Sequence, residues 1–101
     1  MAFEFYPPWH QVNDDGPHLE QELSRELSER HLLFGLKAKA IARRQDCDDV
    51  LFEISGASFR YAAVHLTWSG MAEAEPSWPY TKTFETLEDC LAFCADPDNS
   101  L

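Results

Sequence analysis

Residues 36–54, with the sequence LKAKAIARRQDCDDVLFEI, decide the fold, because here apolar residues begin to alternate with polar ones. The alternating sets are Leu36, Ala38, Ala40 and Ala42 on one side and Lys37, Lys39, Ile41 and Arg43 on the other. This pattern predicts a strand with a small-residue face toward the core and a basic face outward. A second strand is predicted over Asp49–Ile54, and the aspartates before it predict a solvated hairpin turn.

Two helices and two more strands flank this hairpin in the sequence. The first predicted helix follows an Asp15-Gly16 cap and repeats leucine at every fourth position from Leu19 to Leu27. The other predicted elements are a strand over Phe59–Trp68, a strand over Thr81–Phe84 and a helix that begins with a Thr86/Asp89 capping box and ends at Pro97. The sequence therefore predicts an α+β fold for residues 16–101: a helix, a four-stranded antiparallel meander and a second helix, with both helices on one sheet face.

The first helix is expected to carry a solvated outer face. Glu26 and Arg30 are opposite charges four residues apart, a spacing that stabilises exposed helix surfaces, and Arg25 and Glu29 repeat it. Gly35 can adopt the positive φ that ends such a segment. Trp68 is the last residue of the strand predicted over Phe59–Trp68, and its side chain is expected in the core.

Residues 1–15 form a separate arm rich in aromatic residues and proline. Pro7 and Pro8 exclude a regular helix, whereas the surrounding aromatic rings are costly to leave in water. Three interpretations follow: an edge strand over Phe3–Tyr6 docked on the body, a partner-binding arm, or a frayed tail. We favour the docked strand. A homodimer formed through this arm is a further hypothesis.

The chain is strongly acidic, with 18 Asp and Glu against 8 Lys and Arg in 101 residues and a formal net charge of −10. This charge disfavours direct binding to nucleic acid or to anionic membranes and favours a basic protein partner. The N-terminus lacks the pattern of a secretory signal, so a cytoplasmic location is expected. Three cysteines, Cys47, Cys90 and Cys94, do not make a disulfide framework, and the last two are expected to be buried thiols on one helix face.

Motifs for catalysis or cofactor binding are missing from the sequence. No Gly-x-Ser-x-Gly element, phosphate-binding glycine loop or zinc-ligand spacing occurs. The expectation is therefore a protein that is not an enzyme and that uses neither a cofactor nor a metal.

For the acidic residues, a solvated surface is the simpler interpretation and a partner-binding surface is the functional one. Carboxylates beside a rigid aromatic ring resemble an interface in which acids pair with Arg or Lys of the partner. The candidate residues are Asp46, Asp48, Asp49, Glu73, Glu75 and Trp78. The leading hypothesis is a stoichiometric inhibitor of the immunity type, which plugs the basic cleft of a toxin or enzyme that processes nucleic acids or nucleotides.

An alternative hypothesis places a shallow site on the open face of the sheet. The residues expected to line it are Arg43, Glu53, Tyr61 and His65. Such a face would bind a small molecule or a peptide. It would support catalysis if His65 served as an acid or base.

Four short motifs resemble those of a known group of proteins. They are Ala40-Ile41-Ala42-Arg43-Arg44, Asp48-Asp49-Val50-Leu51-Phe52, Val64-His65-Leu66-Thr67-Trp68 and Trp78-Pro79. From about His18 onward the chain is similar to small, functionally uncharacterised bacterial proteins that share this pattern. The resemblance implies a bacterial origin, and it does not indicate an activity for the chain.

Overall fold

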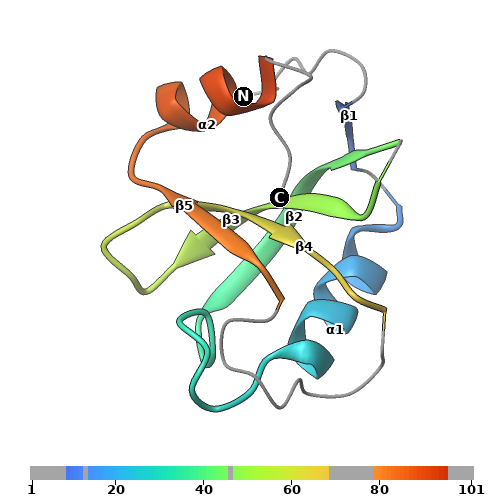
Figure 1. Cartoon of the computed structure of the whole chain (residues 1–101), viewed down its shortest axis with the longest axis vertical. Helices are drawn as coiled ribbons and strands as arrows, with labels where there is room; N and C mark the ends of the chain where they lie inside the picture. The colour runs from blue at the N-terminus through green and yellow to red at the C-terminus, as the bar shows by residue number, and fades with distance from the viewer. Residues whose placement is uncertain (1–8, 13, 46, 69–78, 96–101) are drawn as a thin grey trace.

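The computed structural model describes residues 9–12, 14–45, 47–68 and 79–95 (Figure 1). The elements are β1 (Trp9–Gln11), α1 (Gly16–Glu26), β2 (Lys37–Arg44), β3 (Asp49–Ser55), β4 (Tyr61–His65), β5 (Thr81–Phe84) and α2 (Leu87–Ala95). The strands described form one antiparallel sheet in the order β1-β2-β3-β4-β5. The α+β class is confirmed, but this sheet has five strands where the sequence predicted four.

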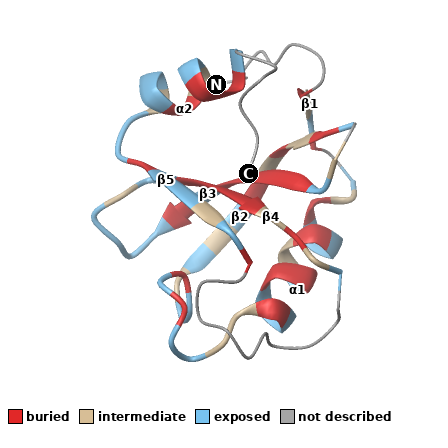
Figure 2. Cartoon of the chain, in the orientation of Figure 1, coloured by how far each residue is buried: buried red, intermediate tan, exposed pale blue. Residues whose placement is uncertain are grey.

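The two helices cover opposite faces of the sheet, so the prediction that they share one face is wrong (Figures 1 and 2). Leu19 and Leu23 of α1 pack with Phe52, whereas Cys90 and Phe93 of α2 pack in a second cluster on the other side. That second cluster contains Leu51, Tyr61 and Ala63. The physical reason is that β3 and β4 carry continuous apolar runs, which need cover on both faces.

A β-bulge in β2 interrupts the predicted alternation. Ala40 pairs with Phe52 and Ala42 pairs with Leu51, so Ile41 is an extra residue on β2. Ala40 therefore packs on the α1 side, whereas Ala42 packs on the α2 side. The bulge also turns Arg43 toward α1, which changes the neighbours of this side chain.

The end of the predicted arm is part of the sheet. Trp9 is 1% exposed in the α2-side cluster and pairs with Arg44 of β2. The backbone N–H of Val12 continues the contact by donating to the carbonyl of Ile41. The strand predicted over residues 3–6 lies outside the described residues.

The C-terminal end of α1 holds the segment that follows β4. Glu26 was expected on a solvated face, but it is fully buried and its two carboxylate oxygens accept from the backbone N–H groups of Thr67 and Trp68 at 2.8 and 2.9 Å. Trp68 was expected in the core, but it is 37% exposed, has a φ of 58° and stacks on His18. β4 ends at His65, and this carboxylate stabilises the irregular backbone beyond it.

His31 joins the segment after α1 to the start of β5. Its Nδ1 accepts from the backbone N–H of Leu33 at 3.0 Å, and its Nε2 donates to the carbonyl of Pro79 at 3.0 Å. The neutral imidazole satisfies both contacts, so the buried ring is fixed in one tautomer. Gly35, four residues later, has the predicted positive φ, but α1 already ends at Glu26 with Leu27 as its C-cap, so Gly35 does not end the helix.

Glu26 makes stability depend on pH. The pKa of Glu26 is raised from 4.5 to about 7, and burial is the largest cause. The hydrogen bond with Glu22 is the second cause. The folded chain therefore holds a proton that the unfolded chain releases, and its stability falls as pH rises from about 4.5 to about 7. Over this pH range we expect the free energy of unfolding of Glu26→Gln to fall by about 3 kcal/mol less than that of wild type. Urea unfolding at several pH values measures the difference. Exposed Glu29→Gln is the control and should keep the wild-type slope; equal slopes for Glu26→Gln and wild type would contradict the assignment.

Candidate functional site

The predicted partner-binding residues divide into three groups. Asp46, Glu73, Glu75 and Trp78 lie outside the described residues. Asp48 is exposed in the turn between β2 and β3. Asp49 is fully buried, so its carboxylate belongs to an internal pair and not to an exposed acidic surface.

Asp49 is paired with His65 across β3 and β4. The two residues are register partners, and Nδ1 of His65 donates to Oδ1 of Asp49 at 2.8 Å. The His65 side chain is 32% exposed. Since the carboxylate only accepts, it fixes the proton on Nδ1 and leaves Nε2 of the neutral ring as an acceptor. An oriented imidazole of this kind can exchange protons, but none of the cavities described below includes it.

The four residues of the predicted sheet-face site do not form one site. α2 covers that face, and Tyr61 is 8% exposed. Burial raises the pKa of Tyr61, with a smaller contribution from Glu53, which lines the same depression at the β3–β4 hairpin. Arg43 is on the other face because of the bulge, and His65 is held by Asp49.

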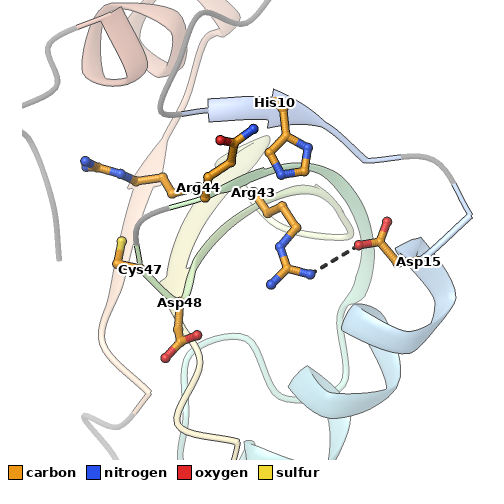
Figure 3. Close-up of a pocket in the computed structure, with 7 residues that line it drawn as sticks. His10, Asp15, Arg43, Arg44, Cys47 and Asp48 are labelled. Atoms are coloured by element: carbon orange, nitrogen blue, oxygen red, sulfur yellow. Dashed lines mark hydrogen bonds and ion pairs between the residues drawn. The ribbon is translucent and has the colours of Figure 1, made fainter.

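A cavity of about 510 Å³ brings together residues from both predicted sites (Figure 3). Its lining residues are His10, Asp15, Arg43, Arg44, Gln45, Cys47 and Asp48. They come from β1, the residue before α1, the end of β2 and the turn before β3. Arg43 and Asp48 were assigned to different sites from the sequence, yet they line the same opening.

Arg43 is fixed at the centre of this cavity. The register places it between His10 of β1 and Val50 of β3. Its Nη1 donates to Oδ2 of Asp15 at 3.2 Å, and the two side chains are 30% and 45% exposed. This ion pair joins β2 to the start of α1, and it holds the guanidinium at the cavity surface (Figure 3).

Sequence reasoning missed His10 and Asp15 as cavity residues. Asp15 was assigned only to the helix cap, yet it makes no side-chain cap hydrogen bond. An unbroken alternation predicts Arg43 on the α2 side of β2, but the bulge places it on the α1 side. Pairing β1 with the end of β2 would have placed His10 beside Arg43, but the strand predicted in the arm was over residues 3–6.

A second surface lies between β5 and α2. A groove of about 550 Å³ is lined with Lys82, Thr83, Phe84, Glu85, Asp89, Ala92 and Phe93. The rings of Phe84 and Phe93 lie 5.3 Å apart at its base. Glu85, Glu88 and Asp89 are exposed around the start of α2. The Thr86 hydroxyl accepts from the backbone N–H of Asp89 at 3.2 Å, which confirms this part of the predicted capping box.

Two thiols on α2 are buried, as the sequence predicted. Cys90 and Cys94 are free, and a hydrogen bond from the Cys90 thiol lowers the pKa of Cys94, with a smaller lowering from Arg44. The same hydrogen bond and burial raise the pKa of Cys90. Among the described residues no three His, Cys, Asp or Glu side chains form a group suited to a metal ion.

Comparisons with family models, curated proteins and solved structures find no match to this chain. Within the described ranges, no helix has both the length and the apolar character needed to cross a bilayer.

The pair of Asp49 and His65 is expected to stabilise the fold. We expect Asp49→Ala to lower the free energy of unfolding by about 1–3 kcal/mol, because it removes a buried acceptor and frees the tautomer of His65. The adjacent, exposed Asp48→Ala is the matched control and should change stability by less than about 0.5 kcal/mol. Urea unfolding measures the energies, and ¹⁵N shifts of the imidazole report the tautomer. Loss of the Nδ1-protonated form without loss of stability would show that the pair only orients the ring.

Proposed function

We propose that this chain is an acidic binding protein without catalytic activity, and that it inhibits a basic toxin or enzyme acting on nucleic acids or nucleotides, in the manner of an immunity protein. The observation that supports this most directly is the β5–α2 groove. It combines the aromatic pair with two exposed carboxylates, Glu85 and Asp89, which is the chemistry expected of a surface for a cationic partner.

In the sheet as described, β5 lies at one edge, and that edge adds a way to align the partner. Hydrogen bonds from Arg60 to Phe84 and from His65 to Tyr80 show that residues 80 and 84 direct their backbone groups toward β4. By alternation, the backbone groups of Thr81 and Thr83 point away from the sheet. Among the described strands β5 pairs only with β4, so an extended basic segment of a partner can add to this edge.

Lys82 limits which partner the groove accepts. Its Nζ lies 6.0 Å from the centroids of both Phe84 and Phe93. A partner cation therefore meets Glu85 and Asp89, because a cation over the rings would face Lys82. Basic residues that flank an apolar one fit this distribution of charge better than an unbroken basic run.

Co-expression with the products of the adjacent genes tests the proposal. We expect one product to arrest growth when expressed alone, and the full-length chain to restore growth and to bind it with an affinity that falls as salt rises. Glu85→Lys with Asp89→Lys should weaken binding at least about tenfold, because both carboxylates that line the groove are replaced by repulsive charges. Isothermal titration calorimetry at two salt concentrations measures the affinity.

Glu29→Lys with Glu53→Lys is the matched control, since both residues are exposed and lie away from the groove. This double variant changes net charge by the same amount and should keep most of the binding and the growth protection. Equal losses in both double variants would assign the effect to net charge alone. Failure of every adjacent product to bind or to arrest growth would overturn the proposed function.

A further inference from the structure

We infer that the cavity around Arg43 binds a small zwitterion that carries a carboxylate and an ammonium group, the chemistry of a free amino acid. This site lies apart from the β5–α2 groove and shares no lining residue with it. With a volume of about 510 Å³ the cavity is an open depression of the surface, with room for a small ligand that stays partly exposed to water.

The guanidinium of Arg43 supplies the carboxylate position. Only Nη1 takes part in the contact with Asp15, so within the described residues Nη2 and Nε remain as donors. A planar carboxylate matches the fork of a guanidinium, and Asp15 holds that fork in place before the ligand arrives. The bulge in β2 is what turns this side chain toward the cavity.

The exposed Asp48 supplies the ammonium position. Its carboxylate lines the same cavity, and Figure 3 shows it across the opening from Asp15, with Arg43 between them. The backbone carbonyl of Asp48 accepts from the N–H of Leu66, so the turn that carries this residue is tied to the end of β4. An ammonium group donates up to three hydrogen bonds, and a carboxylate that is not buried is a suitable acceptor.

The charge balance favours a zwitterion over a simple ion. Among the described side chains, Arg43 meets Asp15 and Asp48 at the opening, whereas Arg44 points away from it (Figure 3), so a simple anion faces the aspartates and a simple cation faces Arg43. A free anion is also opposed by the long-range field of a chain with a net charge of −10. A ligand with no net charge avoids that repulsion, and both of its ends meet a complementary group.

Titration with three matched probes tests this inference. L-serine carries both charges, acetate only the carboxylate and ethylammonium only the cation. We expect ¹⁵N-edited NMR to show shifts at His10, Arg43 and Asp48 with L-serine, and an affinity at least about tenfold higher than for either single-charge probe. Acetate binding as tightly as L-serine, or no shift at these residues with millimolar L-serine, would overturn the inference.

Variants assign the two ends of the ligand. Arg43→Gln and Asp48→Asn should each weaken L-serine binding at least about tenfold, whereas Arg60→Gln and Glu53→Gln should leave it unchanged, since both control residues are exposed and lie outside this cavity. Because Arg43→Gln also breaks the contact with Asp15, Arg43→Lys serves as a second variant that keeps the charge but loses the fork. Unchanged affinity in Asp48→Asn would exclude the ammonium position and with it the zwitterion.

Discussion

The structure depends on burying β3 on both of its faces. Val50, Leu51 and Phe52 are successive residues and none is more than 1% exposed, so one side of the strand needs α1 and the other needs α2. Full burial of each such side chain contributes roughly 1.5–3 kcal/mol, which outweighs the small gains available at the surface. The two-layer arrangement expected from the sequence would have left Leu51 and Tyr61 facing water. The position of every surface site follows from this three-layer packing.

Burial also divides the acidic residues into two groups with different roles. Glu22, Glu26 and Asp49 are inside, where Glu26 and Asp49 bond groups at the end of β4. These side chains stabilise the fold, and because they are buried a binding partner cannot contact them. The net charge of the chain therefore overstates the acidity that a partner can reach. What a partner can reach depends on where exposed carboxylates gather, as they do at the start of α2.

The sequence predicted the elements better than their packing. Alternation located β2 and β3, and the leucine repeat located α1, because these patterns are set by single elements. The sequence pattern of β2 could not reveal the bulge at Ile41, because the extra residue is recognised only from the register with β3. The sequence also could not show that Glu26 turns inward, because its partners, the N–H groups of Thr67 and Trp68, are about 40 positions away in the sequence. Long-range pairing accounts for the errors at the candidate sites in the same way.

The bulge links the fold to the cavity around Arg43. Without the extra residue, Arg43 would share the α2 side with Leu51, and Arg44 would face α1. Arg43 could not then reach Asp15, and the cavity would lose the side chain at its centre. Arg44, 4% exposed, would no longer lie near Cys94, whose pKa it helps to lower. Two neighbouring arginines of a strand always face opposite sides, and the inserted residue decides which one lies under α2 and which one faces the cavity. β-Bulges next to functional sites commonly aim a side chain in this way, which argues that Ile41 is an element of the site as much as of the sheet.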